Sequence, residues 1–292
     1  MVPESLPEEW FERVNRRLSE RQIPHAARPF EALSEISREF NCAVDFPSPL
    51  ASIVFAWFER HSPTGSHAAG ALFTAAFYFD AFFWKVNVPI AYGTVRLNAL
   101  DWIEGAPEYA RAQIQNNREI LSDYMALWTD AMDYGYGIDE MVHLPQNSAY
   151  CRAMASSADQ EIRATVRLLT EDRRPNSKAM ETSRMATEMF LKAYLAAHEG
   201  LTDPDAKAKF GHNIDRLAAR CEVLKQGGEF GRIQELSSVF PKVEARYSGK
   251  RHTNDQLWIG YCVAQFSGTA FVRSLTDRDS RPQFLGGRSC AT

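Results

Sequence analysis

The sequence has few cysteines, and their spacing excludes the structures that cysteines most often build. Its 292 residues include five, at Cys42, Cys151, Cys221, Cys262 and Cys290, and no two of them form a Cys-x-x-Cys motif. An odd, dispersed set argues against a disulfide framework and against a zinc knuckle. We therefore expect buried, reduced thiols, no metal and no cofactor.

No apolar run in the sequence is long enough to cross a membrane as a helix. The closest run is 68–84, which is short and contains Asp80, so we expect a buried core segment there and no membrane contact. The N-terminus, Met1 to Glu4, is acidic and is followed by charged residues, which is not the pattern of a secretory signal peptide. These features predict a cytoplasmic protein.

Several catalytic signatures are also missing. The chain has no His-Glu-x-x-His zinc motif, no Gly-x-Ser-x-Gly elbow and no phosphate-binding loop ending in Gly-Lys-Ser/Thr. Glu140-x-x-His143 is one half of a di-iron signature, but no second half occurs, so we reject a di-iron bundle. The stretch Tyr134-Gly135-Tyr136-Gly137 lacks the third glycine of a dinucleotide fingerprint, and it predicts a turn near a domain boundary.

The net charge of −4 conceals a difference between the two halves of the chain. Residues 1–145 contain 11 Lys and Arg against 20 Asp and Glu, a balance of −9, whereas residues 146–292 contain 22 against 17, a balance of +5. The basic half is suited to nucleic acid and the acidic half to a partner surface. The two halves could equally attract each other, and the sequence leaves both interpretations open.

Helical periodicity dominates the rest of the pattern, and no strand signal is strong enough to predict a sheet. Phe73, Phe77, Ala81 and Trp84 recur at spacings of four, four and three, which predicts a helical stripe. Such a stripe can line a ligand pocket, but burial in the core is the more frequent role of aromatic residues at this spacing.

We predict an all-α protein of two helical domains and a tail. Residues 1–145 would form an aromatic-rich helical domain of unknown role, residues 146–276 an up-and-down helical bundle, and residues 277–292 a loose C-terminal tail.

A long helix after Ser177 is the most informative stretch of the chain. Its Arg184, Glu188 and Lys192 recur at four-residue intervals, so they lie on one face. An intrahelical ladder of salt bridges explains that face more simply than a binding site does. His212 then opens the next helix, where an imidazole could contact a nucleotide phosphate.

Three segments of this half resemble the HEPN family of small helical domains. They are Arg184-x-x-x-Glu188-x-x-Leu191-Lys192-Ala193, His212-Asn213-Ile214-x-x-Leu217, and Ala245-Arg246-Tyr247. Their order and spacing carry the resemblance, which covers about residues 146–276. The resemblance implies a bundle of four or five helices.

Many members of this family resemble or are metal-independent ribonucleases, with an Arg and a His four to six residues apart near the start of the last helix. Arg246 and His252 have five residues between them at that position. The resemblance implies that Arg246 holds the scissile phosphate and that His252 transfers a proton. Lys242, Lys250 and Arg251 would make the surroundings basic and favour RNA.

Two functions therefore remain open. One is an RNA-directed protein acting as a metal-independent endoribonuclease of the defence or toxin type. The other is a non-catalytic helical adaptor that binds a nucleotide or a protein, because Tyr247 stands where the motif usually has a polar residue such as Asn. Convergence of Arg246 and His252 at an exposed basic groove would favour the nuclease, and burial of Arg246 against Glu188 or Glu244 would favour the adaptor.

The last predicted helix follows a capping box, Thr253-x-x-Gln256. Within it Gly260, Ala264 and Gly268 recur every four residues and line one face with almost no side chain. Such a face lets two helix backbones approach closely. It is explained either by packing within the chain's own bundle or by a homodimer interface that would bring two copies of the Arg and His pair together.

Overall fold

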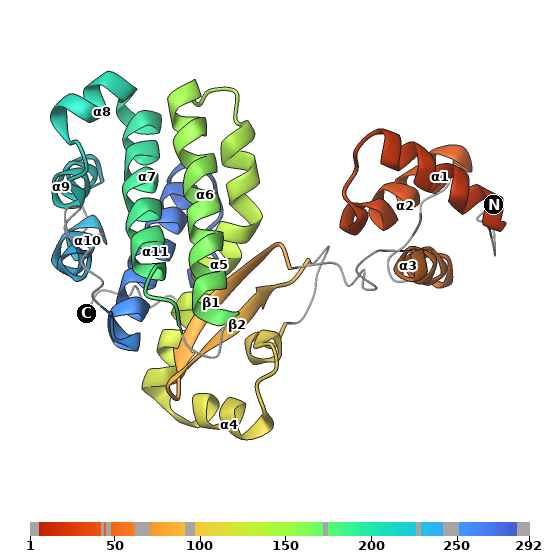
Figure 1. The fold of residues 1–292 in the computed structure, drawn as a ribbon, viewed down its shortest axis with the longest axis horizontal. Helices are drawn as coiled ribbons and strands as arrows, with labels where there is room; N and C mark the ends of the chain where they lie inside the picture. The colour runs from red at the N-terminus through yellow and green to blue at the C-terminus, as the bar shows by residue number, and fades with distance from the viewer. Residues whose placement is uncertain are drawn as a thin grey trace. The chain divides into compact units, whose positions relative to one another are not determined.

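The computed structural model describes residues 6–41, 44, 48–61, 71–90, 97–171, 175–225, 229–241 and 251–284. These residues are mostly helical and belong to two compact units, Met1–Ala71 and Leu72–Thr292 (Figure 1). None of the described helices is both long enough and apolar enough to span a bilayer.

The first unit, as far as it is described, consists of helices around an aromatic core. They are α1 (Glu8–Glu20), α2 (Arg28–Glu39) and α3 (Pro49–His61), with a 3-10 turn at His25–Ala27. Phe11 of α1 stacks on Trp57 of α3 with ring centroids 5.1 Å apart. Arg17 of α1 pairs with Glu35 of α2 at 2.9 Å, but surface ion pairs stabilise little. Burial of the aromatic rings is therefore the main source of stability in this unit.

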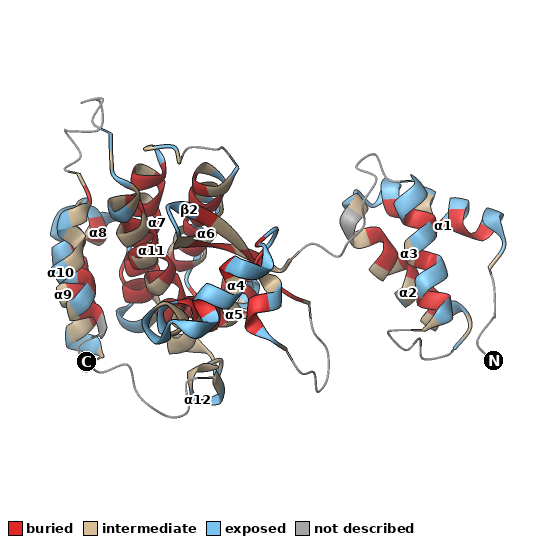
Figure 2. Cartoon of the chain, turned by 90° about the horizontal axis from the view of Figure 1, so that it is seen from below, coloured by how far each residue is buried: buried red, intermediate tan, exposed pale blue. Residues whose placement is uncertain are grey.

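The second unit is a helical bundle that carries one β-hairpin. Its elements are β1 (Phe73–Phe79), β2 (Phe82–Val88), a 3-10 turn (Ala99–Trp102), α4 (Glu108–Asn116), α5 (Arg118–His143), α6 (Ala149–Thr170), α7 (Ala179–Glu199), α8 (Asp203–Lys209), α9 (Ile214–Leu224), α10 (Glu229–Leu236), a second 3-10 turn (Ser237–Val239), α11 (Asn254–Leu275) and α12 (Arg281–Phe284). α7 packs against α6, α9 and α11, and most residues of α7 are buried, as the red colour in Figure 2 shows.

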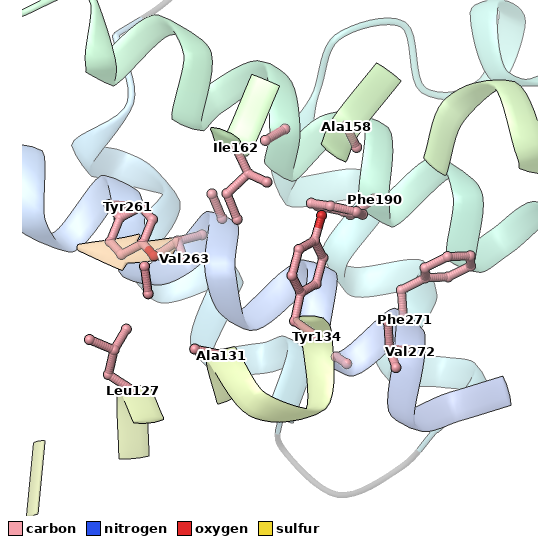
Figure 3. Packing of buried hydrophobic residues seen from close by; sticks show 14 of the residues in the cluster. Leu127, Ala131, Tyr134, Ala158, Ile162, Phe190, Tyr261, Val263, Phe271 and Val272 are labelled. Carbon is pink, nitrogen blue, oxygen red and sulfur yellow. The ribbon is translucent and has the colours of Figure 1, made fainter. Parts of the chain in front are cut away.

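The hydrophobic core of this unit extends across the domain boundary that was predicted after residue 145. Tyr134 of α5 packs edge-on against Phe190 of α7, with ring centroids 5.8 Å apart. Figure 3 shows the Tyr134 ring pointing from α5 toward Phe190. Its hydroxyl donates a hydrogen bond of 2.7 Å to Asp159 of α6. Because α5 shares one core with α6, α7 and α11, the bundle begins well before residue 145, and the division between units lies at Ala71.

Residues 73–88 form an antiparallel hairpin, whereas the sequence predicted a helix. Phe, Tyr, Thr and Val favour strands, and the turn residues Asp80 and Ala81 have φ of 52° and 58°, as a type I′ hairpin turn requires. Phe73 and Phe77 are buried, but strand alternation places them on one face. The described residues are mostly helical with one small two-stranded sheet, so the all-α prediction was only partly right.

Helix α5 continues through Gly135 and Gly137, where the sequence predicted a turn. A Cβ atom at Gly135 would lie 3.0 Å from the Cβ of Phe73, and one at Gly137 would collide with Val272. These two glycines allow the hairpin and α11 to approach α5 closely. They therefore mark tight packing inside the unit, and the helix does not turn at them.

The small-residue stripe of α11 also faces the interior, which corrects the homodimer interpretation. A Cβ atom at Gly260 would lie 2.9 Å from Met180 Sδ, and one at Gly268 would lie 2.8 Å from the Tyr134 ring. Ala264 between them is fully buried. The stripe lets α11 approach α7 and α5, so it is covered by the chain itself and leaves no face for a second copy.

We expect Gly268→Val to lower the free energy of unfolding by about 1–3 kcal/mol, because the added methyl groups overpack a site bounded by aromatic rings. Gly231→Ala in α10 is the matched control, since among the described residues a Cβ atom there would meet nothing within 4 Å beyond its chain neighbours and the backbone of its own helix. It should leave stability unchanged or raise it by up to ~1 kcal/mol. Urea unfolding of both variants measures the difference, and a Gly268→Val protein as stable as the parent would refute the close packing.

Candidate functional site

Of the predicted catalytic pair, Arg246 and His252, the structure describes only His252. Arg246, Lys242 and Lys250 lie outside the described residues, whereas Arg251 and His252 are placed directly before α11. The convergence of Arg246 and His252 stays a prediction. The structure does place the residues around His252.

His252 immediately precedes the cap of α11. Thr253 Oγ1 accepts a hydrogen bond from the Gln256 N–H at 3.2 Å, and the Gln256 side chain accepts one from the Thr253 N–H at 3.1 Å. This confirms the capping box that the sequence predicted. A capped helix N-terminus still carries a partial positive charge, and half-buried His252 stands beside it.

The start of α7 lies next to the start of α11. The backbone N–H of His252 donates to Ser177 Oγ at 3.3 Å, and Ser177 stands two residues before α7 begins. Asn176 Oδ1 accepts from the Lys178 N–H at 2.9 Å and so orders this entry into α7. Exposed Lys178 and Arg251 adjoin the two bonded residues. Two helix N-termini, an imidazole and two cations thus share one end of the bundle, an arrangement that favours an anion.

Acidic residues balance part of this charge. Glu181 lies in the first turn of α7 and Asp255 in the first turn of α11. Glu161 of α6 also interacts electrostatically with Lys178, so among the described residues these carboxylates offset the charges of Lys178 and Arg251. A strongly basic surface at this end therefore depends on the side chains in segment 242–250, which lies outside the described residues.

The face of Arg184, Glu188 and Lys192 forms the predicted ladder, but inside the protein. Arg184 Nη1 lies 3.5 Å from Glu188 Oε2, and Lys192 Nζ lies 2.7 Å from Glu188 Oε1. The three side chains are only 8%, 9% and 10% exposed, from Arg184 through Glu188 to Lys192. Charged residues are buried to this degree only when paired, so we name these three residues the α7 charge cluster and assign it to stability.

His212 covers the open side of the α7 charge cluster. Its Nδ1 lies 2.9 Å from Glu188 Oε1, and its backbone carbonyl accepts from Arg184 Nη2 at 2.7 Å. Its imidazole is 68% exposed. These contacts join the loop before α9 to α7. Among the described residues no contact joins His212 to His252, and Lys242 and Lys250 lie outside them, so a single site formed by the predicted RNA-binding residues stays a prediction.

The sequence analysis missed a second buried ion cluster. Arg273 of α11 lies 2.7 Å from Asp130 and 2.6 Å from Asp133, both on α5. Asp133 also accepts from the Ser280 N–H at 3.0 Å. These bonds tie 277–284 to the bundle, so the described part of the predicted tail is not loose. The sequence did contain a signal for this cluster, namely an Arg within an apolar helix and two Asp residues three positions apart.

Two described cysteines are the buried thiols that the sequence predicted. Cys151 and Cys221 are free and buried, whereas Cys262 is free and half-buried. Burial raises the pKa of the Cys151 thiol to about 11 and raises the pKa of the Cys221 thiol above its usual range. Because the thiolate is the nucleophilic form, neither residue is suited to covalent catalysis. The part of the chain that the structure describes holds no group of three or more His, Cys, Asp or Glu that could bind a metal ion.

Comparison with known proteins identifies no relative of this chain. No family model, no curated protein and no solved structure matches it. The resemblance to HEPN domains therefore rests on the segments around Arg184, His212 and Arg246 alone.

Proposed function

We propose that this protein is a HEPN-like, RNA-directed protein that cleaves RNA without a metal ion at the end of the bundle where α7 and α11 begin. The observation that best supports the proposal is the hydrogen bond from the His252 N–H to Ser177 Oγ, 3.3 Å long. It holds two helix N-termini together beside an imidazole. Helix N-termini favour phosphate, and an imidazole can exchange protons near neutral pH.

The proposed reaction is an attack of a ribose 2′-hydroxyl on the adjacent phosphorus. The bond from phosphorus to the 5′-oxygen breaks, which leaves a 2′,3′-cyclic phosphate and a 5′-hydroxyl end. His252 would remove the 2′-hydroxyl proton or donate a proton to the leaving oxygen. The guanidinium of Arg246 would pair with the non-bridging phosphate oxygens and stabilise their developing charge. Action against RNA in this way fits a defence or toxin role.

RNA cleavage in excess chelator tests this function. The parent protein should cleave, and His252→Ala and Arg246→Ala should each slow cleavage by at least ~100-fold, because each removes a group that acts in the transition state. His143→Ala and Arg118→Ala, at the two exposed ends of α5, are the matched controls and should keep the parent rate. Parent-like cleavage by folded His252→Ala protein would contradict the assignment.

The second candidate is the non-catalytic adaptor that binds a nucleotide or a protein. It is favoured by the balance of Lys178 and Arg251 against Glu181 and Asp255 at the described end of the bundle, because weak net charge suits a small anion better than a long RNA. A folded parent protein that binds nucleotide at this end without cleaving RNA would select the adaptor.

A further inference from the structure

The Ser177 side chain stands beside His252 with its hydroxyl proton unused by the described residues. Its Oγ accepts the His252 backbone N–H at 3.3 Å, but a hydroxyl group also has one O–H donor. Thr182 and Thr187, farther along α7, donate their hydroxyl protons to carbonyl oxygens of that helix, at 3.1 Å and 2.9 Å. Among the described residues, no acceptor is found for the Ser177 proton, so this O–H group is available to a ligand.

The backbone that carries Ser177 is fixed by α6 and by α7. The Asn176 N–H donates to the carbonyl of Leu168 on α6 at 3.0 Å, and Asn176 Oδ1 accepts from the Lys178 N–H at 2.9 Å. The Ser177 carbonyl accepts from the Met180 N–H at 3.1 Å. A donor that is held in place before the substrate arrives needs no reorganisation during the reaction, which makes it more effective in a transition state.

Packing between α7 and α11 fixes Ser177 relative to His252. Met180 is buried where the two helices meet, since a Cβ atom at Gly260 of α11 would lie 2.9 Å from its Sδ. On the other side of the contact, the capping box at Thr253 holds the residue that follows His252. The hydroxyl and the imidazole therefore belong to one rigid corner of the bundle, and both residues are half-buried.

The charges near Ser177 leave little excess of positive charge to hold a phosphate. Glu161 interacts electrostatically with Lys178, and Glu181 and Asp255 lie in the first turns of α7 and α11. A phosphate bound here therefore depends on oriented donors as well as on cations. A neutral hydroxyl can donate to a charged oxygen, and it has no charge that the carboxylates would offset.

We propose that Ser177 is a catalytic residue of the RNA-cleaving reaction, an inference that rests on the proposed function. Its O–H donates a hydrogen bond to a non-bridging oxygen of the scissile phosphate while His252 transfers the proton. Negative charge grows on that oxygen as the 2′-oxygen bonds to phosphorus, so the hydrogen bond strengthens in the transition state. The hydroxyl keeps its proton and forms no bond to phosphorus, so the steps of the reaction are unchanged.

Sulfur substitution at the scissile phosphate tests this contact. The substrate is an oligonucleotide with one ribonucleotide and a sulfur atom at either non-bridging position, cleaved in excess chelator. Because sulfur accepts hydrogen bonds weakly, the parent should cleave one diastereomer at least ~10-fold more slowly than the oxygen substrate. Ser177→Ala should lower kcat for the oxygen substrate about 100-fold with KM nearly unchanged, and it should remove most of the sulfur effect.

Two further variants serve as controls. Ser177→Thr keeps the hydroxyl and should restore both the cleavage rate and the sulfur effect. Ser148→Ala removes a similar hydroxyl, because Ser148 Oγ accepts the Cys151 N–H at 3.1 Å at the start of α6. Cys151 contacts the carbonyl of Ala193 near the end of α7, so Ser148 lies away from the start of that helix and its loss should change neither the rate nor the sulfur effect.

The possible results separate this inference from the proposed function. A folded parent protein that cleaves no RNA would contradict the proposed function and this inference with it. Cleavage by the Ser177→Ala protein at the parent rate would overturn the inference alone. Slow cleavage that retains the full sulfur effect would also overturn it, since Ser177 would then act by positioning His252 and not by contact with the phosphate.

Discussion

Replacing Glu188 with Gln should lower the free energy of unfolding by about 3–5 kcal/mol, the usual cost of removing one partner of a buried ion pair. The side chains of Arg184 and Lys192 are 8% and 10% exposed, and both contact the Glu188 carboxylate. The amide keeps the shape of the side chain but removes its charge. The two buried cations then lose the carboxylate that both of them contact, and the folded state loses the stabilisation that this carboxylate contributes.

Urea unfolding at neutral pH, followed by circular dichroism, measures this loss. Glu181→Gln is the matched control in the same helix, where a half-buried first-turn carboxylate should contribute about 0.3–1 kcal/mol through the helix dipole. His212→Ala should also cost only ~1 kcal/mol or less, because its imidazole is 68% exposed. A similar small loss for Glu188→Gln would mean that the α7 charge cluster is open to water.

The second large effect is expected for Arg273→Met, which should also cost about 3–5 kcal/mol at pH 7. It leaves Asp130 and Asp133 without the cation that lies 2.7 Å and 2.6 Å from them. The same change removes the contact of Arg273 with Asp279, 3.8 Å apart, and so weakens the attachment of the segment that Ser280 joins to Asp133. Arg220→Met is the control, since the pair that Arg220 forms with Glu199 is exposed and should contribute ~1 kcal/mol or less.

The loss in Arg273→Met should depend on pH. Burial raises the pKa of Asp130, and Arg273 opposes that rise, so the pKa of Asp130 should rise further in the variant. An acid with a higher pKa in the folded state binds more protons when folded, and stability falls as the pH rises above its unfolded pKa of about 3.9. The cost should therefore be smaller at pH 4 than at pH 7. Equal costs at both values would contradict an unpaired buried carboxylate.

Local patterns in the sequence predicted well where helices form. They predicted poorly which faces of those helices are buried. The capping box of Thr253 depends on residues three apart, so the sequence contains all of its information. The spacing of Arg184, Glu188 and Lys192 predicted a shared face, but burial of that face depends on α9 and on His212, which spacing along one helix does not reveal.

The errors arose where distant segments decide the structure. Phe73 and Phe77 fit a helical and a strand period equally well, and the turn at Asp80 and Ala81 has no glycine to mark it. Gly135 was predicted to be a break, because only its contact with Phe73 of the hairpin explains its place within α5. The hydrogen bond between His252 and Ser177 likewise joins residues far apart in the chain, and no local motif predicts such a contact.

Binding of a labelled oligouridylate most directly tests an RNA site at the starts of α7 and α11. The parent protein should bind with an affinity that falls as salt rises. The double variant Lys178→Ser/Arg251→Ser should bind at least ~10-fold more weakly and with a shallower salt dependence, whereas Lys207→Ser/Lys209→Ser on exposed α8 should bind like the parent. Equal affinities of the parent and the Lys178/Arg251 variant, or equal losses in both double variants, would contradict an RNA site at this end of the bundle.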